Sequence, residues 1–198
     1  MFMPQLWAET VQAHRAEVRD AIVDAAAELV RRRGLLAVTM SQIATAAGIG
    51  RATLYKYFPD VEHVLAAWHE RQVAAHLAVL AAIGEQPGEA AARLRAVILA
   101  YGEICQQRQQ HSDTALGAAL HRNTAPDDRP EQLLAIFTGL ITEAAASEAV
   151  RRDVPSAELA AFCINALEAA SSTATPAALT RLVDVVWAGL TAPPAVSP

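Results

Sequence analysis

Residues 36–65 read LAVTMSQIATAAGIGRATLYKYFPDVEHVL, and this stretch decides the fold of the N-terminal part of the chain. Thr39 stands three residues before Gln42, which is the spacing of a capping box at the start of a helix. The glycines of 48–50 then mark a tight turn, and Pro59 ends a second short helix. Two short helices joined by a glycine-containing turn predict a helix-turn-helix unit.

A longer helix is expected before this unit, from residue 15 onward. Gly34 ends it, after three arginines at 31–33 that complement the negative end of the helix dipole. Residues 1–14 have no clear period and include Pro4, so we expect a frayed arm or a short extra helix there. The apolar residues that recur at helical spacing within the long helix are Ile22, Ala25, Ala26, Leu29 and Val30.

Helical spacing of apolar residues continues through the rest of the chain, and no alternating strand pattern appears. Alanine supplies much of the 53% hydrophobic content, and alanine favours helices over strands. The sequence therefore predicts an all-α fold of about nine helices. Beyond residue 60, a helix is expected over 61–83, followed by a break over 84–88 and a helix whose apolar stripe runs from Leu94 to Cys105. Further helices are expected from residues 130, 156 and 176, with a short helix over 111–121, a loop over 123–129 and a loose tail from residue 191.

Charge is distributed unevenly along the chain. The formal net charge of −5 excludes a uniformly basic surface, but residues 1–60 carry seven Lys or Arg against six Asp or Glu. The two cysteines have no zinc or redox spacing, and no apolar run reaches the roughly 18 residues of a membrane span. We therefore expect a cytoplasmic protein with no membrane partner and with a locally basic N-terminal part.

Taken with the residues around it, the helix-turn-helix stretch resembles the DNA-binding domain of tetracycline-repressor-like (TetR family) transcriptional regulators. The resemblance is specific over residues 15–65, and beyond them only the length and the all-helical layout agree. It implies a helix-turn-helix DNA-binding domain over 15–60 and a helical effector-binding and dimerisation domain over 61–190. The matching features are Thr39, Ile43-Ala44, Ala47-Gly48-Ile49, Thr53-Leu54-Tyr55, Tyr57-Phe58 and Leu65.

The second short helix carries a face suited to the major groove of DNA. If Leu54 and Phe58 point inward, Ala52 and Lys56 point directly away from the core. Lys56, the only lysine of the chain, can donate to guanine, and the Ala52 methyl can meet a thymine methyl. The alternative for this lysine is simple exposure to solvent. The flanking hydroxyl and guanidinium groups can contact phosphates or bases. The predicted DNA-binding residues are Thr39, Arg51, Ala52, Thr53, Tyr55, Lys56 and Tyr57.

Two positions depart from the pattern of the family. Gly50 stands where the family often has a Ser or Thr cap, and glycine is an acceptable cap at a cost of a few tenths of a kcal/mol. Val61 stands where the family often has a lysine that meets a phosphate. One phosphate contact is therefore expected to be lost, although the amides at the start of that helix can still face a phosphate.

The resemblance also implies an effector pocket between the middle helices of the C-terminal part. Such pockets are mostly apolar with a few orienting polar groups, which fits a neutral or weakly polar ligand. The alternative for each aromatic residue on these stripes is ordinary core packing. The candidate pocket residues are Trp68, His69, His76, Tyr101, Cys105, Phe137 and Phe162.

The last two helices carry apolar stripes of identical spacing. The resemblance implies that they form a four-helix bundle with a second copy, and the alternative is a helix pair packed within one chain. The candidate interface residues are Leu159, Phe162, Cys163, Ala166, Leu179, Leu182, Val183, Val186 and Trp187.

The sequence predicts no metal site, no cofactor and no enzymatic activity. His69 and His76 lie two helical turns apart, too far to chelate one ion together, and Val73 stands where a zinc-protease motif starting at His69 would need its second histidine. No phosphate-binding loop, dinucleotide fingerprint or Gly-x-Ser-x-Gly sequence occurs.

These patterns together predict a homodimeric repressor that a small-molecule effector releases from a near-palindromic operator on double-stranded DNA. The rival interpretation is a small-molecule-binding helical protein whose DNA binding is degenerate. Val61 and the acidic net charge favour the rival. The residues that argue against the rival are Thr39, Thr53, Tyr55 and Lys56, which are intact.

Overall fold

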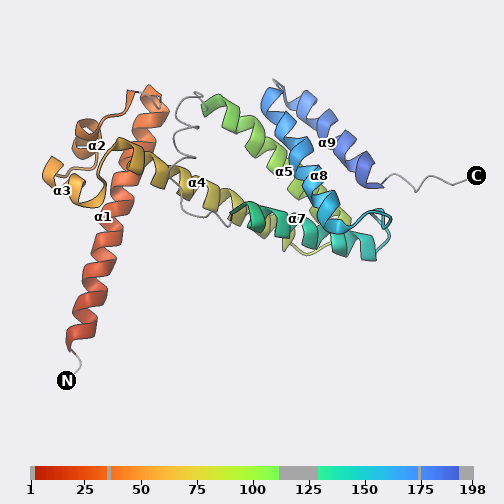
Figure 1. Ribbon diagram of the computed structural model, residues 1–198, viewed down its shortest axis with the longest axis horizontal. Coiled ribbons are helices and arrows are strands. Elements are labelled where there is room, and N and C mark those ends of the chain that lie inside the picture. The colour runs from red at the N-terminus through yellow and green to blue at the C-terminus, as the bar shows by residue number, and fades with distance from the viewer. Residues whose placement is uncertain (1–2, 35–36, 112–128, 174, 192–198) are drawn as a thin grey trace, which may run out of the picture. The chain divides into compact units, whose positions relative to one another are not determined.

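The computed structural model describes residues 3–34, 37–111, 129–173 and 175–191, and every regular element within these ranges is a helix. They comprise eight α-helices and one short 3-10 helix, so the predicted all-α fold is confirmed (Figure 1). The segments expected to form a short helix after residue 111, a loop before residue 129 and a loose tail lie outside the described residues. Of the described helices, none combines the length and apolar content needed to span a lipid bilayer.

Helix α1 (Met3–Arg33) is continuous over 31 residues. The prediction of a frayed arm or a separate short helix over 1–14 is therefore wrong from Met3 onward. Pro4 is compatible with this helix because it lies in the first turn, where a backbone N–H has no helical partner to lose. The helix ends as predicted, with the amide of Gly34 donating to the carbonyl of Val30 at 2.8 Å.

The chain divides into two compact units, and the division in the sequence falls within α4 (Val61–Gly84). The first unit contains α1, α2 (Met40–Ala46), α3 (Arg51–Tyr57) and the start of α4. Helix α2 packs against both α1 and α3. These elements share one apolar core because each turns its stripe toward the others. The largest fully buried side chains of this core are Ile22, Ile43, Leu54 and Leu65.

The second unit is built around α5 (Ala90–His111). This unit also contains the rest of α4, from Val73 onward. Its other helices are α7 (Arg129–Ala146), α8 (Ser156–Glu168), the 3-10 helix η2 (Ala169–Ser172) and α9 (Pro176–Thr191), and α5 packs against each of these four. Helices α5, α8 and α9 lie side by side (Figure 1). The largest fully buried side chains of this core are Leu80, Leu94, Ile98, Phe137, Ile141, Leu167 and Leu190.

Arginine side chains close two helix ends in the second unit. The last carbonyls of an α-helix have no partner within the helix. Arg93 Nη1 donates to the carbonyl of Gly84 at the end of α4 at 2.6 Å, and its Nη2 pairs with Glu143 of α7 at 2.5 Å. Arg152 Nε donates to the carbonyl of Ala145 at the end of α7 at 2.6 Å. The end of α4 is thus tied to both α5 and α7.

Candidate nucleic-acid interface

Helix α3 turns one side to the core and the other to solvent. Leu54 is fully buried and Phe58, the residue just after the helix, is also buried, so these two side chains fix its orientation. Ala52 and Lys56 lie on the opposite side and are exposed, and Tyr55 beside them is 47% exposed. The inward placement of Leu54 and Phe58 that we predicted from their spacing is confirmed.

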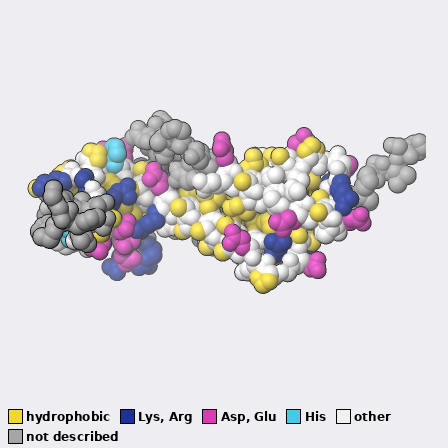
Figure 2. Space-filling model, turned by 90° about the horizontal axis from the view of Figure 1, so that it is seen from below, with side chains coloured by type: hydrophobic (Ala, Val, Ile, Leu, Met, Phe, Trp, Pro, Cys, Tyr) yellow, Lys and Arg dark blue, Asp and Glu magenta, His cyan; other side chains and the backbone are white. Residues whose placement is uncertain are grey.

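The polar side chains of α3 are available to an external partner. Arg51 and Thr53 are exposed, as are Tyr55 and Lys56, whereas Tyr57 is half-buried. Within the described part of the chain, no side chain forms a hydrogen bond or ion pair with any of the four exposed ones. Lys and Arg side chains gather over this unit, at the left of Figure 2.

Thr39 caps α2 through the predicted capping box. Its Oγ1 accepts the amide of Gln42 at 3.4 Å, and Gln42 Oε1 accepts the amide of Thr39 at 3.0 Å. Because the hydroxyl oxygen is the acceptor, the hydroxyl hydrogen is still available for donation. Thr39 is exposed, so this hydrogen can reach a phosphate outside the protein.

The turn between α2 and α3 depends on Gly48. Its φ of +67° lies in the left-handed region, which side chains other than glycine rarely adopt. The amide of the next residue, Ile49, donates to the carbonyl of Ala44 at 3.0 Å and closes the end of α2. This turn sets the angle at which α3 leaves α2, and with it the direction of the exposed α3 face.

Gly48→Ala is expected to lower the free energy of unfolding of the first unit by about 1 kcal/mol, because alanine is strained at this φ. Gly139→Ala is the matched control. Gly139 lies inside α7, where an added Cβ would meet no neighbouring atom within 4 Å, so alanine is expected to stabilise by up to about 1 kcal/mol. Urea unfolding measures both changes, and equal effects of the two substitutions would contradict the strained turn.

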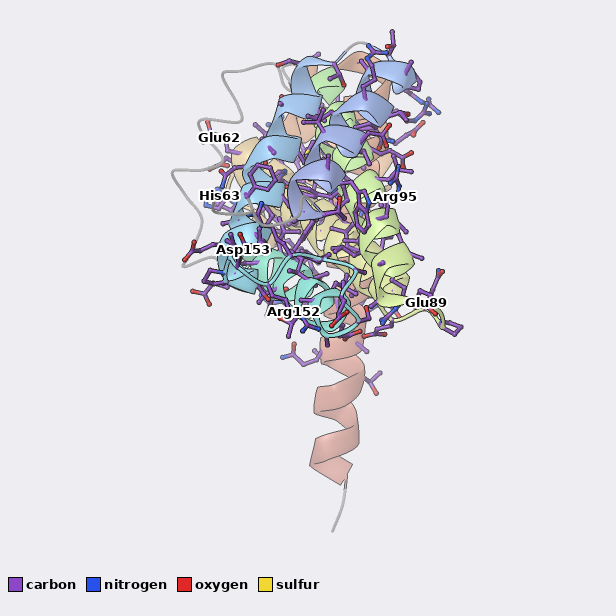
Figure 3. All side chains as sticks on the ribbon, turned by 90° about the vertical axis from the view of Figure 1, so that its right-hand side faces the viewer. Glu62, His63, Glu89, Arg95, Arg152 and Asp153 are labelled. Atoms are coloured by element: carbon purple, nitrogen blue, oxygen red, sulfur yellow. The ribbon has the colours of Figure 1, made fainter. Side chains whose placement is uncertain are left out.

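Asp60 caps α4, the helix that follows the recognition helix. Its Oδ1 accepts the amide of His63 at 3.0 Å and contacts His63 Nδ1 at 2.8 Å. Burial raises the pKa of the Asp60 carboxyl, but the hydrogen bonds from the His63 ring and amide outweigh burial, so the pKa is lowered overall. Glu62 and His63 project next to each other at this helix start (Figure 3). The amide of His63 is therefore already engaged. It does not replace the phosphate contact expected from a lysine at position 61.

Tyr101 lies at the centre of the candidate effector residues of the second unit. Its ring packs edge-on against Phe137, with ring centroids 5.7 Å apart, and Cys105 is buried in the same core. Tyr101 Oη donates to Glu168 Oε1 at 3.0 Å. Burial, followed by the neighbouring Cys105 and Glu168, raises the pKa of Tyr101. We did not predict Glu168 as a partner, because 67 residues separate the two positions and no local pattern links them.

The remaining pocket candidates are divided between the two units. Trp68 and His69 belong to the first unit and are half-buried, and the indole Nε1 of Trp68 is buried with no hydrogen-bond partner in the described part of the chain. His76 is half-buried in the second unit. Phe162 is 45% exposed on α8, and its place in a pocket stays a prediction. No three His, Cys, Asp or Glu residues among those described gather as metal ligands would.

The candidate dimer residues divide into two groups. The first group is buried in the core of its own unit, as in the intramolecular alternative, and comprises Leu159, Cys163, Leu179, Val183 and Val186. A stripe is equally apolar whether it faces its own chain or another, so spacing alone could not separate these cases. The candidates that keep exposed surface are Phe162, Ala166, Leu182 and Trp187.

Two family models match this chain. The model for bacterial regulatory proteins of the tetR family matches residues 22–67, and the model for the C-terminal domain of SbtR-like transcriptional regulators matches residues 86–192. An uncharacterized HTH-type transcriptional regulator of Mycobacterium tuberculosis (strain H37Rv) is 41% identical over 63 residues. This match spans 31% of this chain and 31% of that protein, so it covers less than a third of either.

Solved structures extend the similarity over the whole fold. A TetR-family transcriptional regulator from Pectobacterium atrosepticum has a TM-score of 0.75 at 23% identity, covering 92% of this chain and 98% of that one. A TetR transcriptional regulator from Streptomyces coelicolor has a TM-score of 0.60 at 28% identity, covering 87% and 97%. The described fold is all-helical, α3 presents an exposed face, and the C-terminal family model covers more than half of the chain. The chain therefore belongs to the TetR family of bacterial transcriptional regulators.

Proposed function

We propose that this regulator is a repressor that binds a near-palindromic operator as a homodimer and leaves it when a small-molecule effector binds. The observation that carries the proposal is the outer face of α3, where Arg51, Thr53, Tyr55 and Lys56 are exposed and engaged by no described side chain. Leu54 anchors the other side of the helix in the core. A rigid helix with a small, polar and cationic outer face fits the major groove.

The roles follow from chemistry and position. Lys56 donates to guanine O6 or N7, and Ala52 allows close approach and meets a thymine methyl. Thr39, Thr53 and Tyr55 donate hydroxyl hydrogens to phosphates and set the register of the helix on the duplex. In a two-fold dimer the two recognition helices then contact half-sites about 34–36 Å apart, or a multiple of that spacing.

The dimer is proposed to form through the outer sides of α8 and α9. Phe162 and Val185 keep 45% and 67% of their surface exposed, and Leu182 is half-buried against the core. A Cβ on Gly189 would lie 3.1 Å from Phe162 Cε1, so the ring rests directly on α9 and the two helices present one apolar face. Burying a large apolar side chain stabilises by about 1.5–3 kcal/mol, which favours covering this face with a second copy.

Val185→Asp is expected to convert the dimer to a monomer, because each copy would bring an uncompensated carboxylate into the apolar interface. Val79→Asp is the matched control, since Val79 on α4 is 52% exposed but lies off the α8–α9 face. Light scattering should give twice the chain mass for wild type and V79D and the chain mass for V185D. A dimeric V185D would place the interface elsewhere.

The effector is proposed to bind within residues 61–190, with 15–60 serving DNA binding. Tyr101, Cys105 and Phe137 are the candidate lining residues that share one core, and the Tyr101–Glu168 pair supplies a polar group at its edge. Trp68, His69 and His76 stay candidates on α4. A protein that acts on operators works where the DNA is, so we propose a cytoplasmic location in the bacterial cell.

Selection of bound duplexes from a random library by the purified protein tests the proposed function. Enrichment of sequences with two-fold symmetry is the expected result. Compounds that stabilise the protein in a thermal-shift screen are then tested for release of the selected duplex, since coupling between two sites must be reciprocal. Absence of any enriched sequence would favour the rival function, a ligand-binding protein with degenerate DNA binding. Two observations support that rival: position 61 is valine instead of lysine, and the amide of His63 is already bonded to Asp60.

A further inference from the structure

The N-terminal half of α1 extends past the core of the first unit (Figure 1). Residues 10–17 are all exposed, and full burial along this helix begins only at Ile22. Arg15 and Arg19 are four residues apart and share one side of the helix. At 100° per residue, this is the side that carries Ile22 and Ala26 into the core, so both arginines point back toward the end of α3.

Aromatic rings at the end of the recognition helix hold both arginines. The guanidinium carbon of Arg15 lies 6.0 Å from the ring centroid of Tyr57, and that of Arg19 lies 5.2 Å from the ring centroid of Phe58. Tyr57 is the last residue of α3 and Phe58 follows it directly. A guanidinium over an aromatic face keeps its full charge, and its N–H edges stay free to donate.

No described acidic side chain neutralises the charges of Arg15 and Arg19. Within the described residues neither forms an ion pair, and the acidic neighbour Glu17 lies 3.7 Å from His14. Arg31 and Arg32, at the other end of the same helix, both pair with Glu28, and these hydrogen bonds lower the pKa of its carboxyl to about 2. At one end of this helix two arginines thus share an acidic partner, whereas Arg15 and Arg19 have none among the described residues and lie against the end of α3.

We propose that Arg15 and Arg19 bind two DNA phosphates beside the groove that α3 enters, an inference that rests on the proposed function. Arginine matches phosphate oxygens with two parallel N–H groups, and the aromatic platforms hold the side chains so that little conformational freedom is lost on binding. These contacts offset the phosphate contact that Val61 does not make. Tyr57 accordingly acts as a platform for Arg15 in addition to any phosphate contact of its own.

The test compares the salt dependence of DNA binding in matched variants. The probe is a 30-base-pair duplex of mixed sequence, so no operator is needed. For Arg15→Gln with Arg19→Gln, the slope of log affinity against log salt should become shallower by about 1.8, since each lost phosphate contact removes about 0.9. If a phosphate contact adds no affinity at 1 M salt, the same relation predicts that losing one contact weakens binding about 8-fold at 0.1 M salt.

Two control pairs separate a phosphate contact from other effects. Arg31→Gln with Arg32→Gln changes the net charge equally on the same helix and should leave the slope unchanged, because Glu28 already engages both of these guanidinium groups. Arg15→Lys with Arg19→Lys keeps both charges and should keep the slope. If Arg15→Gln with Arg19→Gln lowers the melting temperature but leaves the salt-dependence slope unchanged, the two arginines only stabilise the position of α3. That result would overturn the proposal.

Lys56→Ala on the selected operator distinguishes failure of this inference from failure of the proposed function. If Lys56→Ala weakens operator binding while the Arg15 and Arg19 glutamine variant keeps the wild-type slope, the inference is wrong and the function stands. If neither change affects binding, both are wrong.

Discussion

Lys56→Ala is expected to weaken binding to the selected operator by about 1–3 kcal/mol, or about 5- to 150-fold, and to relax the base preference at one position of each half-site. The reason is geometric. Lys56 lies on the side of α3 opposite the buried Leu54, is exposed, and forms no ion pair with any described side chain. Fluorescence anisotropy with the selected duplex and with single-base variants of it measures both effects.

Lys56→Arg and Tyr55→Phe are the controls for this experiment. Arginine keeps the charge and the donors that guanine accepts, so most of the affinity should remain. Tyr55→Phe removes one hydroxyl at a 47% exposed position and should weaken binding evenly across sequences, as a phosphate contact would. An unchanged base preference in Lys56→Ala would show that this side of α3 does not read the operator.

Leu54→Ala is expected to destabilise the first unit by about 2–5 kcal/mol and to abolish operator binding. Leu54 is fully buried, and its removal leaves a cavity between α3 and the helices on which α3 rests. The second unit has its own core, so the dimer should survive. Hydrogen exchange should show lost protection in α2 and α3 and unchanged protection in α5 and α8.

Leu99→Ala is the matched control because it deletes the same atoms at a site where they are not enclosed. Leu99 on α5 is 40% exposed, so the change in the free energy of unfolding should stay within about 0.5 kcal/mol. Global unfolding by Leu54→Ala, with loss of the dimer, would contradict the separation of the chain into two cores.

The sequence predicted the helices well because their ends carry strong local signals. Thr39 with Gln42 started α2 where the capping box required it, and Pro176 opened α9. The helical period also predicted which side of α3 is buried, since Leu54 and Phe58 are four residues apart. Pro4 was misleading, because proline breaks a helix in its interior but is tolerated in its first turn.

The features that the sequence did not predict depend on contacts between distant segments. The Tyr101–Glu168 hydrogen bond joins α5 to α8, and the aromatic platforms for Arg15 and Arg19 come from another helix. The cap of α4 was a different case. Asp60 and His63 have the three-residue spacing of a helix cap, so that local pattern could have been recognised.

Arg93 is a single joint between three helices of the second unit. From α5 it donates to the carbonyl of Gly84 at the end of α4 and pairs with Glu143 of α7. Loss of this one side chain would leave the carbonyl of Gly84 without its donor and the carboxylate of Glu143 without its partner. One position therefore governs how the end of α4 meets both α5 and α7.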